Sequence, residues 1–554
     1  MTTQLKIASA QLNAHVGDLW GNIDKVRAAY ARAKSDGSDI LVLPEQIIIG
    51  YPAEDLVLKP AAIADCRELC EDFAKLTKDG PAVVFNAPWM VDGALYNAAL
   101  FMHDGKITDV RMKHHLPNYG VFDEFRIFTR GPLPKPIEFK GIKIGLPICE
   151  DLWQAGVASH LAELGAEILI SPNGSPWRRS ALSERVEALG ENLHNEGLPL
   201  IYVNQVGGQD ELVFDGSSFS MAADGSIVQS LKSFVEDYDV AVWEKGADGW
   251  TCTSAKTEIQ LSGYEADWRA MCLGLSDYVN KNGFKQVILG LSGGVDSAIV
   301  AAIAVDALGP QRVWCVMMPT KYTSGDSLSD AEDCAQRLGC RYDTIAIKPA
   351  IDAFADMLDP FFSGTEPNTA EENIQSRARG LTLMALSNKF GPMLVTTGNK
   401  SEMAVGYATL YGDMCGGYNP LKDVYKTEVF KLCEWRNAHN PADLFGGDTP
   451  IPVNIITKPP SAELRDDQKD SDSLPEYEVL DDILRGLVEE ELPLEDIIAR
   501  GHSEADVKRI QHLLYIAEYK RRQAPPGVKI GTKNFGKDRR YPITNGYRDV
   551  VPDE

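Results

Sequence analysis

The fold of the second half depends on the sequence Gly290-Leu291-Ser292-Gly293-Gly294-Val295-Asp296-Ser297. It follows the apolar stretch 286–291, which predicts a buried strand, and precedes the alanine-rich stretch 298–308, which predicts a helix. Two adjacent glycines let the backbone approach an anion closely, and the free N–H groups of a helix N-terminus favour negative charge. The two serine hydroxyls are further donors to phosphate oxygens. The sequence therefore predicts a phosphate-binding loop between a strand and a helix.

Carboxylates near this loop indicate a divalent cation. Asp296 would repel a phosphate unless a cation lay between them, which points to Mg²⁺. Glu402 ends the sequence Thr396-Thr397-Gly-Asn-Lys-Ser-Glu402, directly after the predicted strand 393–397. Strand ends of a parallel sheet meet at the edge where ligands bind, so Glu402 is a candidate second ligand of the same metal. Taken alone, this second stretch also fits an ordinary turn after a strand.

Short apolar stretches alternate with helix-like stretches in both halves, which predicts an α/β layer architecture. The predicted strands of the first half are 5–11, 40–43, 82–86, 142–148, 168–171 and 200–204, with helices at 22–34, 59–77 and 181–195. The second half begins with a predicted helix, 264–282, and continues with strands at 286–291, 313–318, 342–347 and 393–397. We therefore predict domains at 1–245 and 264–554, a linker at 246–263 and a mobile loop at 459–474.

The charge balance argues against a polyanionic partner. Acidic residues outnumber Lys and Arg by 80 to 55, a formal charge of −25, which repels nucleic acid and anionic membranes. A basic strip at 501–548 either balances the acidic stretch 461–500 or belongs to a local anion site. No apolar run approaches the ~20 residues needed to span a bilayer, and the start lacks a signal-peptide pattern. With scattered cysteines and no Cys-x-x-Cys, we expect a cytoplasmic protein.

A candidate nucleophile lies in the first half. Cys149 ends the predicted strand 142–148, and a thiol at a strand-to-helix turn suits nucleophilic attack. Many cysteines in such positions are simply small buried residues. Two further residues support the catalytic interpretation: Glu45 follows the strand 40–43, and Lys113 opens a segment rich in turn residues.

The second half resembles a known family of ATP-using enzymes. The loop 290–297 is similar to the SGGxDS pyrophosphate loop of the ATP pyrophosphatase superfamily, and its pairing with TGNKSE is typical of NAD⁺ synthetases. Further blocks at 318–324, 371–379, 411–413, 422–427, 518–527 and 539–543 resemble that family in the same order. The resemblance implies a doubly wound parallel sheet, ATP bound by the loop and Thr397, Mg²⁺ held by Asp296 and Glu402, and deamido-NAD⁺ bound by Asn373, Glu402 and Lys520.

The first half resembles another family. Glu45, Lys113 and Cys149 are in the chain order of the nitrilase superfamily, and 113–128 is similar to the glutaminase domain of glutamine-dependent NAD⁺ synthetases. The resemblance implies an αββα sandwich in which Glu45 is the base, Cys149 the nucleophile and Lys113 the group that stabilises the oxyanion. It also implies that Tyr119 and Ser175 contact L-glutamine. The family usually carries Gly-Lys shortly after Ser175-Pro, whereas this chain has Arg178-Arg179-Ser-Ala, so either arginine is a candidate for binding the glutamine carboxylate.

Together the resemblances imply ATP-dependent amidation of deamido-NAD⁺ through an acyl adenylate, with ammonia supplied by glutamine hydrolysis. They also imply a homo-oligomer, with octamers among bacterial two-domain members. Asparagine synthetase is a weaker alternative, because it needs an N-terminal cysteine that this start lacks, and GMP synthetase uses a Cys-His-Glu glutaminase. A non-catalytic nucleotide-binding protein is the alternative outside enzymes, and the candidate residues in both halves argue against it.

Overall fold

The computed structural model describes residues 3–193, 196–247, 249–461, 463–465 and 474–549. The chain divides into two compact units, Met1–Ser262 and Gly263–Glu554. The predicted linker 246–263 contains strand β15 (Gly249–Ser254), because Trp250 is buried in the core of the first unit. Most of the loop predicted at 459–474 lies outside the described residues. Among the described helices, none is long and apolar enough to span a membrane.

Two stacked sheets form the first unit. The first sheet has the spatial order β15, β14 (Asp237–Gly246), β1 (Thr3–Gln11), β2 (Ile40–Val42), β3 (Ala82–Val91), β4 (Ala94–His103) and β5 (Lys106–Met112). The second has the order β13 (Ile227–Ser230), β12 (Phe219–Met221), β9 (Leu200–Asn204), β8 (Ile168–Asn173), β7 (Ile142–Gly145) and β6 (Ile137–Phe139). A separate hairpin consists of β10 (Val206–Gln209) and β11 (Leu212–Asp215).

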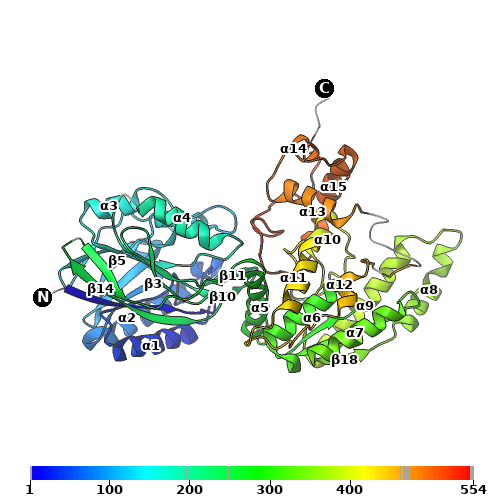
Figure 1. Cartoon of the computed structure of the whole chain (residues 1–554), viewed down its shortest axis with the longest axis horizontal. Coiled ribbons are helices and arrows are strands. Elements are labelled where there is room, and N and C mark those ends of the chain that lie inside the picture. The colour runs from blue at the N-terminus through cyan, green and yellow to red at the C-terminus, as the bar shows by residue number, and fades with distance from the viewer. Residues whose placement is uncertain (1–2, 194–195, 248, 462, 466–473, 550–554) are drawn as a thin grey trace. The chain divides into compact units, whose positions relative to one another are not determined.

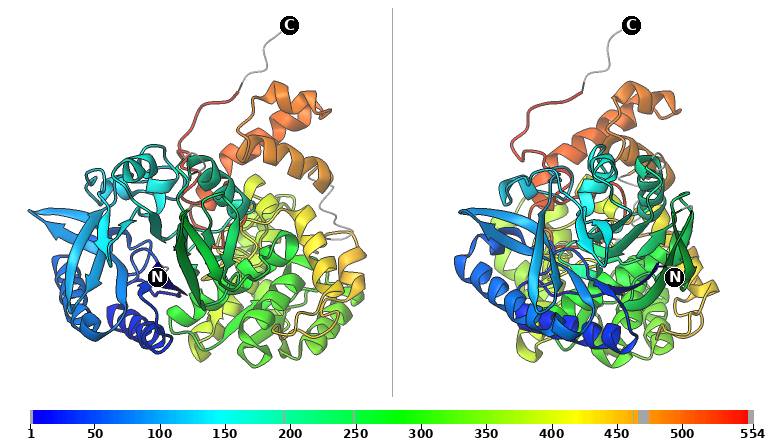
Figure 2. Two further views of the ribbon diagram at one scale, coloured as in Figure 1. Left: turned by 60° about the vertical axis from the view of Figure 1, so that its left-hand side comes forward. Right: turned by 90° about the vertical axis from the view of Figure 1, so that its left-hand side faces the viewer.

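The alternation of side chains along the strands explains this layering. In β1, Ile7 packs into the core between the sheets, whereas its neighbour Ala8 belongs to the core on the outer face. Helices α1 (Leu19–Ser35) and α2 (Pro60–Ala74) cover that outer face. Helices α3 (Val157–Glu163) and α4 (Ala181–Leu193) cover the other sheet, and Figures 1 and 2 show the two helix pairs on opposite sides. The αββα sandwich is as predicted.

The second unit is built on a parallel sheet with the order β18 (Arg341–Thr344), β17 (Val313–Met317), β16 (Val287–Gly290) and β19 (Met393–Leu394). After β16, the chain forms β17 and β18 on one side of that strand and later forms β19 on its other side. Ligands of doubly wound sheets bind where the strand order reverses in this way. The phosphate loop after β16 and the 396–402 segment after β19 both lie at this point.

Helices cover the parallel sheet and extend beyond it. α6 is buried around nearly its whole circumference, as its apolar run 298–305 predicts. Helices α13 to α15 pack with α10 in a separate core and stand together on one side of the unit (Figure 2). The helices are α5 (Gly263–Lys281), α6 (Val295–Leu308), α7 (Gly325–Leu338), α8 (Lys348–Phe362), α9 (Thr369–Phe390), α10 (Lys400–Val405), α11 (Lys426–Ala438), α12 (Val453–Thr457), α13 (Tyr477–Val488), α14 (Leu494–Ala499), α15 (Glu504–Ile516) and α16 (Glu518–Arg521).

Candidate active sites

Cys149 lies at a strained turn in the first unit. Strand β7 ends at Gly145, three residues earlier than the predicted strand 142–148, and a short 3₁₀ helix, η4 (Cys149–Leu152), follows. Cys149 has a φ of 43°, in the left-handed region that costs a non-glycine residue about 1 kcal/mol or more. Burial raises the pKa of its thiol, and the nearby charge of Glu45 adds to this, while Lys113 and the backbone N–H of Gly174 oppose it. The thiol therefore needs a base in order to react.

Lys113 joins two buried carboxylates beside this thiol. Its Nζ lies 2.7 Å from Glu45 Oε1 and 3.0 Å from Glu124 Oε1, and Lys113 and Glu45 are both 0% exposed. Burial acts to lower the pKa of the lysine, but the charges of Glu124 and Glu45 outweigh it, so the net shift is upward. Burial raises the pKa of Glu124 to about 7. The structure thus brings Glu45, Lys113 and Cys149 together and adds Glu124, which the sequence interpretation did not single out.

Asp151 connects the lysine segment to the cysteine turn. Its Oδ1 accepts hydrogen bonds from the backbone N–H groups of His114 (2.9 Å) and His115 (2.7 Å). Its Oδ2 accepts from the N–H of Ile148 at 3.0 Å. Burial raises the pKa of Asp151 to about 6, against the effect of these three donors. One buried carboxylate thus fixes the segments on either side of the site.

The two predicted glutamine contacts differ in their surroundings. Tyr119 is 53% exposed, and its hydroxyl donates to Glu150 Oε2 at 3.0 Å. Ser175 is buried, and its Oγ accepts from Arg185 Nε at 3.2 Å. Arg185 is itself fully buried and donates to both carboxylate oxygens of Asp215, at 2.9 and 2.7 Å.

The two arginines that follow Ser175 were candidates for the glutamine carboxylate. The guanidinium of Arg178 is already bonded to Glu184, on the first turn of α4. This pairing competes with any bond from Arg178 to a substrate carboxylate. Neither Arg185 nor Asp215 was predicted: Arg185 lies ten residues beyond Ser175, and Asp215 lies a further 30 residues along the chain.

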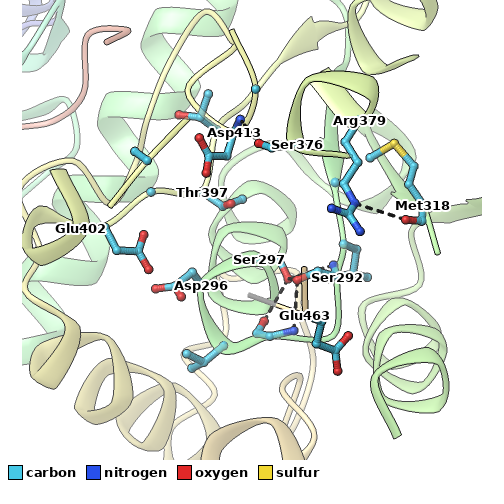
Figure 3. Close-up of a pocket in the computed structure, with 18 of the residues that line it drawn as sticks. Ser292, Asp296, Ser297, Met318, Ser376, Arg379, Thr397, Glu402, Asp413 and Glu463 are labelled. Carbon is cyan, nitrogen blue, oxygen red and sulfur yellow. Dashed lines mark hydrogen bonds between the residues drawn. The ribbon is translucent and has the colours of Figure 1, made fainter. Parts of the chain in front are cut away.

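The loop after β16 has the geometry of an anion-binding turn. The hydroxyls of Ser292 and Ser297 lie 3.1 Å apart, and the N–H of Ser292 donates to Ser297 Oγ at 3.1 Å. Figure 3 shows these hydroxyls together at the wall of a pocket. Gly293 has a φ of 80°, and a Cβ there would lie 2.3 Å from the carbonyl oxygen of Ser327. Only glycine fits at this position, because the loop runs against α7.

The loop lines a cavity of about 480 Å³, within the range of small-molecule sites. Thr397 and Glu402 line it from the segment after β19. Arg379 from α9 also lines it, and its Nε donates to the carbonyl oxygen of Met318 at 3.3 Å (Figure 3). The predicted ATP-binding residues in its wall are Gly290, Leu291, Ser292, Gly294, Val295, Asp296, Ser297 and Thr397.

Asp296 and Glu402 face the same positive charge. Lys426 Nζ bonds Asp296 Oδ2 and lies 3.7 Å from Glu402 Oε1, and Asn399 Nδ2 donates to Asp296 Oδ1 at 3.0 Å. Figure 3 shows the two carboxylates on one side of the pocket. No group of three or more His, Cys, Asp or Glu that could hold a metal occurs among the described residues. Two carboxylates suit Mg²⁺ that is also bound by phosphate oxygens and water, so the residues fit that ion.

The other two predicted deamido-NAD⁺ contacts, Asn373 and Lys520, do not line the cavity. Asn373 Oδ1 accepts from the hydroxyl of Thr409 at 2.9 Å. Lys520 Nζ donates to the carbonyl oxygens of Gly406 and Ala408, both at 2.7 Å, just beyond the end of α10. Burial raises the pKa of Asp413, which does line the cavity, to about 6, and the charge of Lys520 acts against that rise. Lys520 therefore lies next to the wall rather than in it.

Comparison with known proteins assigns both units. Residues 6–242 match the carbon-nitrogen hydrolase family, and residues 267–524 match the NAD synthase family. The glutamine-dependent NAD(+) synthetase of Rhodobacter capsulatus is 50% identical over 550 residues, which cover 99% of this chain and 100% of that protein. The chain belongs to the glutamine-dependent NAD⁺ synthetase family.

Solved structures of glutamine-dependent NAD⁺ synthetases agree with this assignment. The enzyme of Acinetobacter baumannii, solved in complex with ADP, is 40% identical, with a TM-score of 0.79 and coverage of 99% of this chain and 100% of that chain. The enzyme of Cytophaga hutchinsonii has the same fold, with a TM-score of 0.82 at 22% identity and 98% coverage of both chains. The predicted α/β architecture, with a nitrilase-like first unit and an NAD synthase second unit, is confirmed.

Proposed function

We propose that this chain makes NAD⁺ by amidating deamido-NAD⁺ with ATP, using ammonia that it releases from L-glutamine. The observation that carries the proposal is that one chain of this family contains both complete sets of groups. The first unit contains the buried carboxylate of Glu45 and the buried amine of Lys113 near Cys149, and the second contains a glycine-rich loop and two carboxylates where the strand order of a parallel sheet reverses, which supports the proposal.

In the first unit Cys149 is the nucleophile. Glu45 accepts the thiol proton, and Cys149 Sγ attacks the carbonyl carbon of the glutamine side-chain amide. The oxyanion that forms is stabilised by the ammonium of Lys113, which is effective because the group is buried and held in place by two carboxylates. Collapse of the intermediate, with the proton returned to nitrogen, expels ammonia and leaves a thioester. Water then cleaves the thioester to glutamate and restores the thiol.

Tyr119 and Ser175 bind the glutamine substrate. Arg185, which is itself bonded to Asp215, donates to Ser175 and so fixes its orientation before substrate arrives. The bond from Tyr119 to Glu150 holds the phenol beside the cysteine turn.

In the second unit a carboxylate is activated and then amidated. The carboxylate of deamido-NAD⁺ attacks the α-phosphate of ATP, pyrophosphate leaves, and an acyl adenylate forms. Ammonia then attacks the acyl carbon, giving the amide of NAD⁺ and AMP. Asp296 and Glu402 would hold Mg²⁺, which when bound neutralises charge on the phosphates. The loop N–H groups and the hydroxyls of Ser292 and Ser297 bind the pyrophosphate oxygens.

Further contacts complete this assignment. Thr397 lies three residues beyond β19 and contacts ATP, and Glu402 contacts deamido-NAD⁺ from the same cavity wall. Asn373 and Lys520 are further deamido-NAD⁺ contacts by the family resemblance, although neither lines the cavity. We also expect the chain to form a homo-oligomer, with an octamer as one candidate, and light scattering of the purified protein measures this directly.

Phosphorus NMR of the complete reaction tests the proposal. The purified chain is mixed with ATP, Mg²⁺ and deamido-NAD⁺, with either glutamine or ammonia as the nitrogen source. We expect AMP, pyrophosphate and NAD⁺ in equal amounts with both sources, and no AMP when deamido-NAD⁺ is omitted. Formation of ADP and phosphate, or AMP release that does not need deamido-NAD⁺, would contradict the proposal.

A further inference from the structure

Only one of the two carboxylate oxygens of Glu45 is hydrogen-bonded to the described residues. Its Oε1 accepts from Lys113 Nζ and from Asn97 Nδ2, each at 2.7 Å. Its Oε2 is buried and has no hydrogen-bond partner among the described residues. Buried carboxylate oxygens are ordinarily satisfied, so a bare one beside a nucleophile indicates a function. Asn97 is the uncharged member of this arrangement and has no role in the reaction described above.

The orientation of the Asn97 amide follows from a chain of hydrogen bonds. The backbone N–H of Gln46 can only donate, and it bonds Asn86 Oδ1 at 2.7 Å. The same oxygen accepts from Gln46 Nε2 at 3.1 Å, and Gln46 Nε2 also donates to Asn97 Oδ1 at 2.7 Å. These bonds fix which end of each side-chain amide carries the oxygen. Because Oδ1 of Asn97 accepts from Gln46, Nδ2 of Asn97 must face Glu45.

Asn97 also fixes the lysine. It lies on β4 opposite Pro88 of β3, and its backbone carbonyl accepts from the N–H of Lys113 at 2.8 Å. One fully buried residue thus holds the backbone of Lys113 and the side chain of Glu45. Because Asn97 lies on a paired strand, this position is rigid.

Gly174 lies next to both the free oxygen and the thiol. A Cβ on Gly174 would lie 3.3 Å from Glu45 Oε2, and the backbone N–H of Gly174 hydrogen-bonds Cys149. The side of Glu45 that Asn97 leaves free is therefore the side of Cys149.

We propose that Asn97 is a positioning residue that, with Lys113, occupies Oε1 of Glu45 and so reserves Oε2 to accept the proton of Cys149. This inference rests on the proposed glutaminase function and adds a residue to it. Without Asn97, either oxygen of the Glu45 carboxylate can bond Lys113. A smaller fraction of molecules then has an unbonded carboxylate oxygen facing the thiol of Cys149.

Asn97→Leu tests the proposal, because leucine is of similar size but lacks the amide. Gln229→Leu is the matched control: Gln229 is also 0% exposed, and its Nε2 donates to the carboxylate of Asp239 at 2.7 Å, outside the site. We expect Asn97→Leu to lower kcat for glutamine hydrolysis about 10- to 100-fold, with KM changed less than about twofold. Alkylation of Cys149 by iodoacetamide should slow by a similar factor. Ammonia-dependent NAD⁺ synthesis should be unchanged.

The control should lose thermal stability without losing kcat. If Asn97→Leu does not fold, Asn97→Ser replaces it, since serine leaves space in the site but cannot reach Glu45. Parental kcat and alkylation in a folded Asn97 variant, or an equal loss of kcat in Gln229→Leu, would overturn the proposal. Failure of the proposed glutaminase function would give a different result from failure of this inference, because the Cys149→Ala variant would then still hydrolyse glutamine.

Discussion

The two sites of this chain handle charge in opposite ways. In the first unit Glu45 and Lys113 are fully buried and bonded to each other, with the thiol beside them. In the second unit the side chains of Asp296 and Glu402 remain 17% and 19% exposed and face a cavity of about 480 Å³. One site is preassembled from buried side chains that are bonded to one another, and the other is an open space with backbone donors at its wall.

The difference follows from the substrates. Attack on an amide needs a proton acceptor and an oxyanion stabiliser in fixed places, and burial strengthens both. A nucleotide triphosphate with Mg²⁺ brings its own charges and water, so that site needs room, and its ion pair between Lys426 and Asp296 lies at the wall of the cavity. We therefore expect substitutions in the first unit to lower the rate of the chemical step. Substitutions in the second unit should instead change the binding of the substrates and of Mg²⁺ and the charge around the phosphates.

The largest effect is expected from Cys149→Ala, which removes the nucleophile and leaves the second unit unchanged. Glutamine-dependent synthesis should fall at least about 10³-fold, while ammonia-dependent synthesis stays within about twofold. Parallel assays of NAD⁺ formation with the two nitrogen sources measure this. Cys66→Ala, at a fully buried cysteine of the same unit, is the control and should keep both activities. Loss of the ammonia-dependent reaction in Cys149→Ala would show that the sites are not separable.

Asp296→Asn tests the open site. It keeps the size of the side chain but removes the charge that faces Lys426 and the expected metal, so pyrophosphate release should fall about 10²- to 10³-fold. The required Mg²⁺ concentration should rise, which a titration of the reaction with Mg²⁺ measures. Asp333→Asn, in a surface ion pair with Arg337, should have no effect. Normal pyrophosphate release by Asp296→Asn would exclude this carboxylate from the metal site.

The two adjacent glycines of the loop offer a matched pair. Gly293→Ala should raise KM for ATP about 10-fold or more and cost about 2–4 kcal/mol of stability, because φ is 80° and Cβ would meet a backbone oxygen at 2.3 Å. Gly294 has a φ of −86°, and its Cβ would have no neighbour closer than 3.4 Å. Gly294→Ala should therefore leave the stability of the fold nearly unchanged. Urea unfolding and ATP kinetics of both variants check this, and equal effects would refute the geometric argument.

Asp151→Asn should disturb the closed site more weakly. Its amide would face one of three backbone donors, at a cost of about 1–3 kcal/mol and about 10-fold in kcat for glutamine. Burial raises the pKa of Asp151 to about 6, so the folded unit retains a proton that the unfolded chain releases above about pH 4. The stability contribution of Asp151 therefore falls as pH rises from about 4 to 6. Unfolding at pH 5 and pH 7 should show a smaller difference in the variant, and an unchanged pH dependence would contradict this.

Lys520→Ala should have the smallest effect. Its ammonium bonds two backbone carbonyls and lies beside the wall of the cavity, so we expect a rise of a few-fold in KM for deamido-NAD⁺, with glutaminase activity retained. Lys508→Ala, in a surface pair with Glu504, is the control. A fall in melting temperature without any change in KM would show that Lys520 only caps α10.

The sequence predicted the buried strands of both units but missed the hairpins. The predicted strands at 5–11, 40–43 and 200–204 correspond to β1, β2 and β9, because apolar residues predominate in each. β4 and β5 were missed, although β4 is mostly apolar; in β5 four of the seven residues are polar. Their turn, Asp104-Gly105, has a positive φ at both residues, as does Asp92-Gly93 before β4. Asp-Gly between alternating stretches is a hairpin signal that was available in the sequence.

Site residues that belong to a sequence motif were predicted. Site residues that only the fold brings together were missed. Ser292 and Asp296 lie within one loop, so the sequence shows them together. Glu124 and Arg185 bond residues 11 and 10 positions away, and Asp151 bonds a segment more than 30 residues away, so no helix or turn spacing reveals these pairs. The left-handed backbone of Cys149 is also invisible in the sequence, because it depends on how β7 meets η4.

The most direct test of the account follows the nitrogen atom. The chain is given ATP, Mg²⁺, deamido-NAD⁺, glutamine labelled with ¹⁵N in its side-chain amide, and unlabelled ammonia below the concentration that supports synthesis, and NAD⁺ is analysed by mass spectrometry. The account predicts ¹⁵N in the carboxamide of NAD⁺, with one AMP formed for each NAD⁺, and no label when the chain carries Cys149→Ala. Unlabelled NAD⁺ from the parent chain, or labelled NAD⁺ from the Cys149→Ala chain, would contradict it.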